Sequence, residues 1–334
     1  MNFLITGGAG YIGSHAVKAL REKYDEHRVA VLDSLDRGHR QAVPIDTPFY
    51  QLDLSETDAV AELLKRERID CVMNFAALAY VGESVNQPLR YYHNNTAGTL
   101  SLLRAMDAVG VRRLVHSSTC ATYGKPAPHH IPLSEDMPQN PINPYGWSKL
   151  FTERILRDHA ATRKDFAFAA PRYFNVAGSA ADGTIGEHHE PETHLIPLLL
   201  LTALGRRREF TIYGDDYDTS DGTCIRDYIH VEDLVEAHLT MAEALTDGDQ
   251  FFYNLGIGKG YSVREMVESA KRVTGINFPV KIGSQRPGDP PTLFANADRA
   301  RRDLDWQARW TDIDAIIETA WRWFRNHPKG YGKG

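Results

Sequence analysis

This sequence of 334 residues is poor in cysteine, in positive charge and in long apolar runs. Its three cysteines, Cys71, Cys120 and Cys224, are widely spaced and form no CxxC pair. This pattern indicates neither a disulfide framework nor a zinc knuckle, and it favours a reducing cytoplasm. The formal net charge is -6 at pH 7, and the one arginine run, Arg206 to Arg208, is short. We therefore expect no nucleic-acid partner.

Membrane segments are also not expected. The longest apolar run, Leu195 to Leu204, contains Pro197 and is too short to span a bilayer. A glycine-rich loop follows Met1 within seven residues, so we expect no signal peptide ahead of it. The absences together predict a cytoplasmic protein that has neither a membrane nor a nucleic acid as its partner.

Short apolar runs alternate with helical patterns through the first half of the chain. The runs predict strands at 3–6, 28–33, 49–53, 70–76, 113–118 and 166–174. The helical patterns cover 11–24, 57–67, 89–109 and 145–161. Strands that alternate with helices at this spacing predict an α/β fold with a Rossmann-type, doubly wound parallel sheet.

The pattern changes after residue 174. Residues 175–193 and 215–224 are polar and without periodicity, which is typical of loops that carry ligand contacts. Short strands at 210–213 and 228–230, and helices that begin at Val231 and Val263, predict a smaller, mixed α/β lobe for the substrate.

The loop after the first expected strand predicts a dinucleotide site. Gly7, Gly10 and Gly13 fit GxxGxxG, and Gly8, Gly10 and Gly13 fit GxGxxG. Asp33 stands 20 residues after Gly13, at the end of the second expected strand. Glycines let the backbone approach a pyrophosphate at a helix N-terminus, and the aspartate can accept both ribose hydroxyls. The alternative is a tight turn followed by a capping aspartate.

The acidic residue at the end of that strand bears on the choice of cofactor. A carboxylate repels a 2'-phosphate, so Asp33 favours NAD over NADP. Arg37 and Arg40 follow closely in the sequence and leave that choice open.

The stretch Asn143-Pro-Tyr-Gly-Trp-Ser-Lys149 places a phenol and an ammonium on one face at the start of a helix. For Tyr145 to act as a base near pH 7, its phenolate needs about 4 kcal/mol of preferential stabilisation. An ammonium roughly 4 Å away supplies up to about 4 kcal/mol at an effective dielectric of ~20, and burial opposes it. The positive charge of an oxidised nicotinamide would add to that of Lys149. The alternative is an ordinary surface helix start.

Three further residues suit a sugar nucleotide. Thr119 follows the fifth expected strand, at the sheet edge where ligands bind, and its hydroxyl can relay a proton for a sugar hydroxyl. Arg226 and Arg286 could hold a diphosphate from two sides. The alternatives are an ordinary loop hydroxyl and two solvated arginines.

One loop is rich in histidine and glutamate. It contains Glu187, His188, His189, Glu190, Glu192 and His194. Their spacing matches no ligand pattern of a known metal site, so we interpret the segment as a polar loop and predict no metal.

These motifs resemble the extended short-chain dehydrogenase/reductases, and within them the UDP-glucose (UDP-galactose) 4-epimerase family, over almost the whole chain. The segments that carry the resemblance are TGGAGYIGSH, FAALAYVGES, NNTAGTL, STCATYG, NPYGWSK, RYFNVAG, DGTCIRDYIHVEDL, YNLGIGKG and RPGD. The resemblance implies tightly bound NAD, reversible inversion at C4 of a UDP-sugar through a 4-keto sugar, and a homodimer. Helix 89–109 and the helix of Tyr145 would form the dimer contact. We expect residues 1–174 plus about 231–256 to bind NAD, and residues 175–230 plus about 257–334 to bind the UDP-sugar.

The resemblance also implies roles for individual residues. Tyr145 is the base, Lys149 lowers its pKa and holds the nicotinamide ribose, and Thr119 occupies the Ser/Thr position of the family. The positions that match NAD contacts are Gly7, Gly10, Tyr11, Ile12, Gly13, Asp33, Asp53, Leu54, Phe75, Ala76, Ala77, Asn95, Tyr145, Lys149 and Tyr173. The positions that match substrate contacts are Thr119, Asn175, Leu195, Arg226, Arg286, Asp289 and Leu293. The two arginines would contact the diphosphate, and Asp289 would contact the uridine ribose.

Three positions depart from the family pattern. Ala79 stands where many members carry lysine, and His194 stands where asparagine is common. Leu293 is intermediate between the tyrosine and the small residues found there, so UDP-N-acetylhexosamines stay open as substrates. AYVGES and STCATYG also resemble the UDP-arabinose branch, which leaves a UDP-arabinose/UDP-xylose 4-epimerase open.

Two more distant functions remain. A nucleotide-sugar 4,6-dehydratase of this fold would carry an Asp-Glu pair where Cys120 and Ala121 stand. A non-catalytic NAD-binding protein would not need Thr119, Tyr145 and Lys149.

Overall fold

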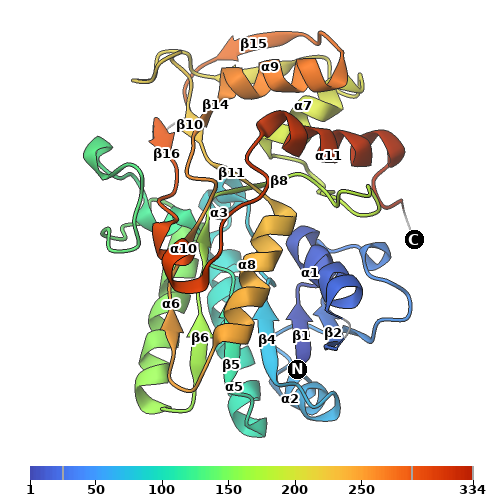
Figure 1. Cartoon of the computed structure of the whole chain (residues 1–334), viewed down its shortest axis with the longest axis vertical. Coiled ribbons are helices and arrows are strands. Elements are labelled where there is room, and N and C mark those ends of the chain that lie inside the picture. The colour runs from blue at the N-terminus through green and yellow to red at the C-terminus, as the bar shows by residue number, and fades with distance from the viewer. Residues whose placement is uncertain (25, 287–288, 333–334) are drawn as a thin grey trace.

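A seven-stranded parallel sheet forms the larger lobe in the computed structural model, which describes residues 1–24, 26–286 and 289–332 (Figure 1). Across the sheet the strands follow the order β12-β6-β5-β4-β1-β2-β3, and every neighbouring pair is parallel. Their bounds are β1 Asn2–Thr6, β2 Arg28–Asp33, β3 Phe49–Gln51, β4 Cys71–Asn74, β5 Arg113–His116, β6 Ala167–Ala169 and β12 Gln250–Phe251. This order confirms the predicted Rossmann-type sheet.

Helices cover both faces of the sheet because its central strands are apolar on both sides. Along β1, Phe3 and Ile5 belong to one core and Leu4 to the other. The core of Phe3 includes residues of α1 (Tyr11–Lys23), α8 (Val231–Ala244) and α10 (Asp298–Leu304). The core of Leu4 includes residues of α2 (Thr57–Arg66), α5 (Gly98–Val109) and α6 (Pro144–Thr162).

The expected helix 89–109 is present, but its regular α-helical pattern is interrupted. It consists of α4 (Pro88–Tyr91), a wide π-helical turn (Tyr92–Ala97) and α5. The turn contains Asn95, whose amide donates to the Leu78 carbonyl and to the Ser148 hydroxyl, both at 3.0 Å. Wide turns of this kind occur often at functional sites, where they aim a side chain that a regular helix would direct elsewhere.

The expected strand 166–174 is also interrupted. Pro171 lacks the N–H that would continue the ladder, and the chain divides into β6 and β7 (Arg172–Tyr173). β7 pairs with β13 (Asn254–Leu255) instead of continuing in the main sheet.

The smaller lobe is built from short strand pairs and three helices. β8 (Asn175–Ala177) pairs with β11 (Tyr228–His230), so the region expected to be loop from residue 175 begins with a strand. The other strands are β9 (Phe210–Tyr213) beside β15 (Val280–Gly283), and β10 (Ile225–Arg226) between β14 (Tyr261–Ser262) and β16 (Thr292–Leu293). The helices α7 (Leu195–Ala203), α9 (Val263–Thr274) and α11 (Ile313–Asn326) enclose a separate core.

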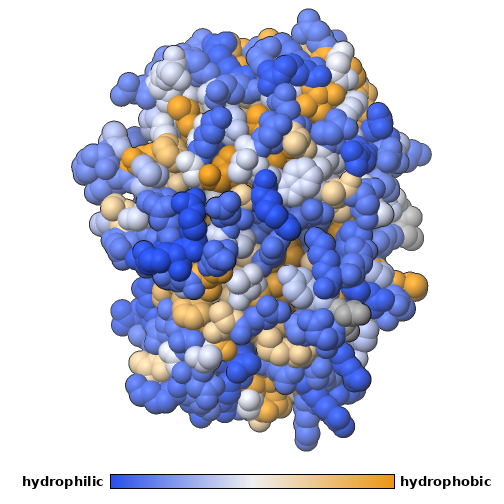
Figure 2. All heavy atoms as spheres, in the orientation of Figure 1, coloured by the Kyte–Doolittle hydropathy of each residue, from blue (hydrophilic) through white to orange (hydrophobic). Residues whose placement is uncertain are grey.

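Short helices connect these elements. They are α3 (Val81–Asn86) and 3-10 turns at Arg40–Ala42, Cys120–Tyr123 and Pro128–His130. The face shown in Figure 2 is mostly hydrophilic, with apolar side chains in small groups. None of the helices within the described ranges has both the length and the apolar composition needed to cross a bilayer.

Candidate active site

The glycine loop brings β1, the start of α1 and the end of β4 into close contact. Gly7 has a φ of +69°, and a Cβ there would lie 2.6 Å from the Ala76 nitrogen. A Cβ on Gly13 would lie 2.2 Å from the Gly7 carbonyl oxygen. Gly10 is the N-cap of α1, and the first turn of that helix contains no acidic residue. The N-terminus of α1 can therefore receive an anion such as a pyrophosphate.

A cleft opens beside this loop at the carboxyl ends of the strands. The predicted cofactor residues that line it are Gly7, Gly10, Asp33, Asp53, Leu54, Phe75, Ala76 and Ala77. The carboxylate of Asp33 accepts hydrogen bonds from the Ala9 nitrogen at 2.9 Å and the Leu35 nitrogen at 2.8 Å. Burial raises the pKa of Asp33, and these two hydrogen bonds oppose the rise. Tyr11 and Ile12 lie just behind the loop, in the first turn of α1.

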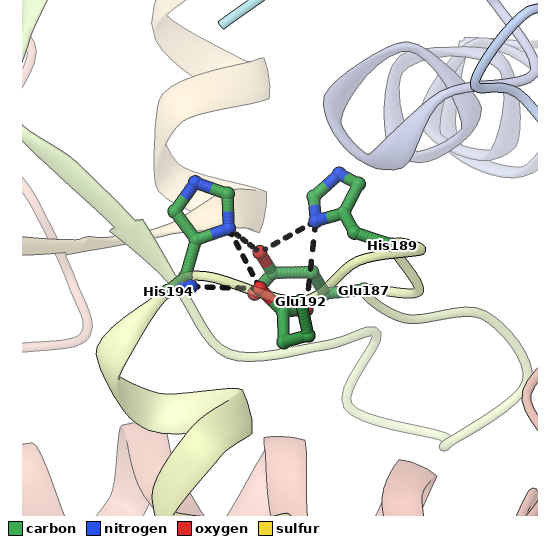
Figure 3. A group of neighbouring side chains, drawn as sticks. All are labelled: Glu187, His189, Glu192 and His194. Carbon is green, nitrogen blue, oxygen red and sulfur yellow. Dashed lines mark hydrogen bonds and ion pairs between the residues drawn. The ribbon is translucent and has the colours of Figure 1, made fainter. Parts of the chain in front are cut away.

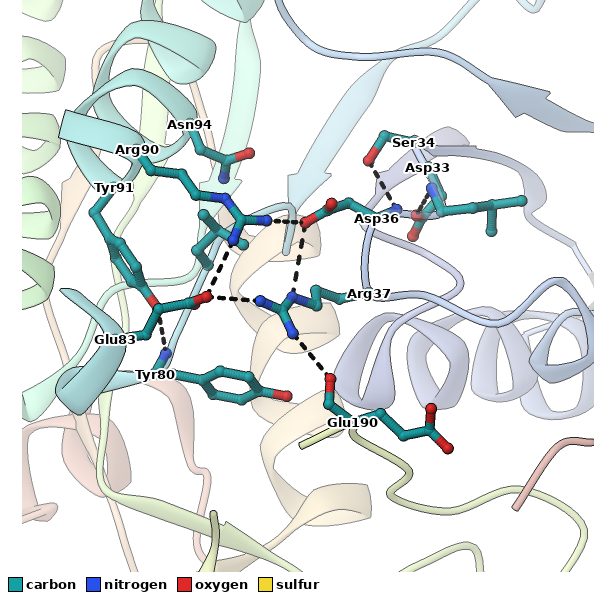
Figure 4. A network of polar contacts seen from close by, with 12 residues as sticks. Asp33, Ser34, Asp36, Arg37, Tyr80, Glu83, Arg90, Tyr91, Asn94 and Glu190 are labelled. Atoms are coloured by element: carbon teal, nitrogen blue, oxygen red, sulfur yellow. Dashed lines mark hydrogen bonds and ion pairs between the residues drawn. The ribbon is translucent and has the colours of Figure 1, made fainter. Parts of the chain in front are cut away.

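Arg37, which Figure 4 shows, and Arg40 both contact other groups of the protein. Arg37 forms an ion pair with Glu83 at 2.8 Å and donates to the Glu190 carbonyl at 3.0 Å. Arg40 lies over the Phe49 ring and donates to the Val43 carbonyl at 2.8 Å. Both arginines are thus engaged with groups other than Asp33, which supports NAD over NADP.

Tyr145 and Thr119 meet where α6 begins beside the end of β5. Asn143 caps α6 by accepting from the Gly146 nitrogen at 2.8 Å, and Pro144 occupies the first helical position. Thr119 caps the following 3-10 turn through the Ala121 nitrogen at 3.1 Å. Burial raises the pKa of the Tyr145 phenol well above its usual value, and a hydrogen bond with Thr119 opposes the rise.

Lys149 lies one turn after Tyr145 and is buried. Its ammonium donates to the Ser117 carbonyl at 2.7 Å. Burial lowers the pKa of Lys149 to about 7. Burial thus raises the pKa of Tyr145 and lowers that of Lys149, so the protein alone favours the neutral form of both groups.

Asn95 and Tyr173, two other predicted cofactor residues, lie near Tyr145 and Lys149. Asn95 accepts from the Leu78 nitrogen at 2.9 Å and so ties the loop after β4 to α6. Tyr173, on β7, packs its ring 6.0 Å from that of His238, and burial raises its pKa to about 12. Asn95 thus contacts the turn of α6 between Tyr145 and Lys149, and Tyr173 lies near enough to Tyr145 to raise its pKa.

Glu153, one turn after Lys149 on α6, forms a buried ion pair with Arg172 that the sequence motifs did not predict. Glu153 accepts from Arg172 at 2.7 and 2.9 Å and from the Ser118 hydroxyl at 2.6 Å. The spacing of Tyr145, Lys149 and Glu153, four residues apart on one helix face, was the sequence pattern that could have revealed it.

Short strands of the smaller lobe carry three of the predicted substrate residues, Asn175, Arg226 and Leu293. Arg226 forms an ion pair with Asp289 at 2.7 Å, and Leu293 lies opposite Arg226 in the register of β10 and β16. Arg286 is exposed, and its guanidinium lies 4.2 Å from the centre of the Tyr213 ring. Pro287 and Gly288 of the RPGD stretch fall outside the described residues.

Asn175 and Leu195 also belong to the predicted substrate residues. Asn175 is in β8, opposite Tyr228 of β11, and Leu195 is the first residue of α7. Directly before Leu195, the structure gathers Glu187, His189, Glu192 and His194 into one cluster (Figure 3). Sequence spacing did not foresee this cluster. Burial favours neutral imidazoles, but the carboxylates raise the pKa of His189 to about 9 and that of His194 to about 10.

The family model described as "NAD dependent epimerase/dehydratase family" matches residues 3–256. The chain belongs to this family. The match confirms NAD as the predicted cofactor, and the resemblance drawn from the sequence motifs is confirmed with it.

Relatives and solved structures are similar over nearly the full chain. The UDP-glucose 4-epimerase of Lactobacillus helveticus is 49% identical over 332 residues, which is 99% of each protein. A UDP-glucose-4-epimerase structure from Stenotrophomonas maltophila, with bound NAD and formylated UDP-arabinopyranose, has a TM-score of 0.94 at 39% identity, covering 98% of this chain and 99% of that one. The UDP-glucose 4-epimerase from Bifidobacterium longum, in complex with NAD+ and UDP, has a TM-score of 0.93 at 35% identity, covering 99% and 100%.

Proposed function

We propose that the protein is an NAD-dependent UDP-sugar 4-epimerase, an isomerase that interconverts UDP-glucose and UDP-galactose through a transient 4-keto sugar. The observation that carries this proposal is the buried pair of Tyr145 and Thr119 at the carboxyl edge of a parallel sheet, beside the glycine-loop cleft. The relatives reported above bear the name UDP-glucose 4-epimerase, and they match this chain from end to end.

Each group in the site has a role in this reaction. Tyr145 accepts the proton of the sugar 4-hydroxyl, directly or through Thr119. Bound NAD would supply a positive charge that favours the Tyr145 phenolate, and a reversible acceptor for the C4 hydride. Lys149 adds positive charge near the phenol and holds the nicotinamide ribose. The reaction is redox-neutral, so NAD stays bound.

The remaining predicted contacts complete the proposal. Residues of the glycine loop, the end of β2, the loop after β3 and the end of β4 hold NAD, with Asn95 and Tyr173 at the nicotinamide end. Arg226 and Arg286 bind the diphosphate, Asp289 binds the uridine ribose, and Asn175, Leu195 and Leu293 contact the nucleotide sugar. The proposed NAD domain is 1–174 plus about 231–256, and the UDP-sugar lobe is 175–230 plus about 257–334.

The residues after Thr119 do not suit a dehydratase. Elimination of water across C5 and C6 needs an acid and a base, and Cys120 and Ala121 stand at those positions. Burial raises the pKa of the Cys120 thiol to about 12, so it stays neutral near pH 7. Ala121 carries no ionisable group. Epimerisation needs no groups at these positions.

A homodimer in the cytoplasm completes the proposal. Exposed apolar side chains gather on consecutive helices, with Val85 on α3, Leu89 on α4, Leu100 on α5 and Phe151 on α6. An apolar surface of this kind favours association with a second copy. Free thiols at all three cysteines agree with a reducing compartment. Sedimentation of a monomer at micromolar concentration would contradict the dimer.

Parallel substrate assays test the proposed function. The purified protein is incubated with UDP-galactose, UDP-N-acetylgalactosamine and UDP-arabinose, and products are separated by ion-exchange chromatography. We expect fastest inversion of UDP-galactose, with no build-up of NADH and no 4-keto-6-deoxy sugar. If UDP-arabinose is inverted fastest, the protein is a UDP-arabinose 4-epimerase instead. Inversion of no substrate would point to a non-catalytic protein.

A further inference from the structure

Four side chains of the loop before α7 converge on one point. Glu187, His189, Glu192 and His194 each direct one oxygen or nitrogen inward, and these four atoms all lie within 4.8 Å of one another. Figure 3 shows the two imidazoles facing the two carboxylates. The sequence pattern is Glu-x-His-x-x-Glu-x-His, so a segment of eight residues supplies the whole cluster.

The distances match a tetrahedral metal site. His189 Nδ1 lies 3.2 Å from a Glu187 oxygen and 3.6 Å from a Glu192 oxygen. His194 Nδ1 lies 2.9 Å from Glu187 and 3.0 Å from Glu192. Zinc bonds of about 2.0–2.1 Å in a tetrahedron set neighbouring ligand atoms about 3.3 Å apart. The four distances between a histidine nitrogen and a carboxylate oxygen are therefore close to those between neighbouring ligands of a tetrahedral ion.

Hydrogen bonding does not fully account for the cluster. His189 Nδ1 is buried and makes no regular hydrogen bond, and its contacts with the carboxylates of Glu187 and Glu192 are ion pairs. A buried nitrogen that makes no regular hydrogen bond is costly, and its position between two carboxylates suits a bound cation. An ion bound between Nδ1 and the carboxylates would satisfy this nitrogen.

The surrounding contacts hold the ligands in place. One Glu192 oxygen accepts from the backbone nitrogens of Thr193 at 2.6 Å and His194 at 2.7 Å. The Tyr80 ring packs edge-on against the rings of His189 and His194, with centroids 5.6 and 5.9 Å away. Supporting contacts of this kind orient metal ligands in known sites.

We propose that Glu187, His189, Glu192 and His194 bind one divalent transition-metal ion, with zinc as the best match. Two imidazoles and two carboxylates suit zinc, and four protein ligands form a closed, structural site. This inference does not depend on the proposed epimerase activity.

The ion would stabilise the loop that connects the two lobes. The same loop is tied to the sheet lobe by Arg37, which donates to the Glu190 carbonyl (Figure 4). His39 adds a second contact, since its Nε2 lies 3.1 Å from the His188 carbonyl oxygen. At its other end the loop leads directly into α7, which begins at Leu195. A metal here would fix the position of Leu195, one of the proposed substrate contacts.

Metal analysis of the full-length protein tests the proposal. The protein is purified without a metal-affinity tag, treated with a chelator, and titrated with Zn²⁺ or Co²⁺. We expect one equivalent per chain by elemental analysis, and intense visible absorption of Co²⁺ in tetrahedral coordination. A higher melting temperature should accompany zinc binding, because an ion that binds the folded state stabilises it. The His189→Asn and His194→Asn variants should lose both the bound ion and the Co²⁺ spectrum.

Control variants test whether the ion binds at this cluster and not elsewhere on the protein. Glu26, His27 and Glu243 form the second possible ligand group among the described residues, so His27→Asn tests it and should keep the zinc. Glu190→Gln changes an exposed carboxylate of the same loop and should also keep it. Circular dichroism and NAD content establish that each variant is folded. Failure of the folded wild-type protein to bind Zn²⁺ below millimolar concentration would overturn the proposal. Loss of the ion in His27→Asn, or its retention in both cluster variants, would overturn it as well.

Discussion

Glu153 and Arg172 form a two-pronged ion pair that is completely buried between α6 and β7, with N–O distances of 2.7 and 2.9 Å. The Tyr123 hydroxyl also accepts from Arg172 at 2.9 Å, and the Ser118 hydroxyl donates to Glu153. The pair therefore connects the helix of Tyr145 with the segment that ends at Thr119. Through these contacts it helps to position Tyr145 and Thr119.

Replacement of Glu153 with glutamine should destabilise the protein. The change leaves the Arg172 charge buried without its partner, which costs about 3–5 kcal/mol of the free energy of unfolding. Urea denaturation measures this loss. The control is Glu22→Gln, since the Glu22 carboxylate is exposed in its pair with Lys18 and should contribute about 1 kcal/mol or less. A similar small loss in both variants would refute the structural role of the buried pair.

Replacement of Tyr145 with phenylalanine should lower kcat by about 10²–10⁴-fold, the usual contribution of a positioned acid or base. The variant keeps the ring, so NAD should remain bound at the wild-type ratio. A coupled assay of UDP-glucose formation gives kcat, and absorbance after denaturation gives the NAD content. Tyr24→Phe, at the C-terminal end of α1, is the control and should retain full activity. A fully active Tyr145→Phe would exclude the proposed base.

Stability should rise with pH between 7 and 9 because of Lys149. Burial lowers its pKa to about 7, whereas the unfolded chain keeps the ordinary value of 10.5. The unfolded state thus binds one more proton in this range, which adds about 1.4 kcal/mol of stability per pH unit. Glu153 on α6 and His116 on β5 are the neighbouring ionisable groups.

The difference between wild-type protein and Lys149→Met isolates this effect, because cysteines and tyrosines that titrate in the same range are common to both. Urea denaturation at pH 7, 8 and 9 should show a steeper rise for the wild type. Parallel curves would mean that Lys149 titrates normally in the folded protein.

Replacement of Gly7 with alanine should remove the bound NAD. The φ of +69° and a Cβ 2.6 Å from the Ala76 nitrogen force the loop away from β4. Gly82→Ala is the matched control, since a Cβ in α3 at that position meets no atom within 4 Å. We expect Gly82→Ala to keep NAD and to gain up to about 1 kcal/mol from helix propensity. Normal NAD content in Gly7→Ala would contradict the proposed approach of the pyrophosphate.

Replacement of Leu293 with tyrosine should narrow the sugar pocket. The family resemblance implies that the residue at position 293 limits the 2-substituent of the sugar, so a larger ring there should crowd it. Leu293 lies beside Arg226 in the register of β16 and β10. We expect kcat/KM for UDP-N-acetylgalactosamine to fall at least about tenfold relative to UDP-galactose, a loss of about 1.4 kcal/mol. Competition between the two substrates measures the ratio. An unchanged ratio would place the 2-substituent elsewhere.

Several parts of the fold followed from local pattern. Apolar runs such as 28–33 and the glycines of the first loop predicted the parallel sheet and its dinucleotide cleft. Buried strands and positive φ angles can be predicted because each depends on a few neighbouring residues. The π turn at Tyr92–Ala97 did not follow, because it depends on Asn95 reaching Leu78 and Ser148 from distant segments.

The sequence by itself determined the order of strands and helices. It also determined the reactive groups, which are the phenol of Tyr145 and the ammonium of Lys149 on one helix face, and the hydroxyl of Thr119. Only the tertiary structure decided their electrostatics and their partners. Burial raises the pKa of Tyr145 and lowers that of Lys149, and desolvation depends on which elements pack around a group. The convergence of Glu187, His189, Glu192 and His194 likewise arises from the path of a loop that has no periodic pattern to reveal it.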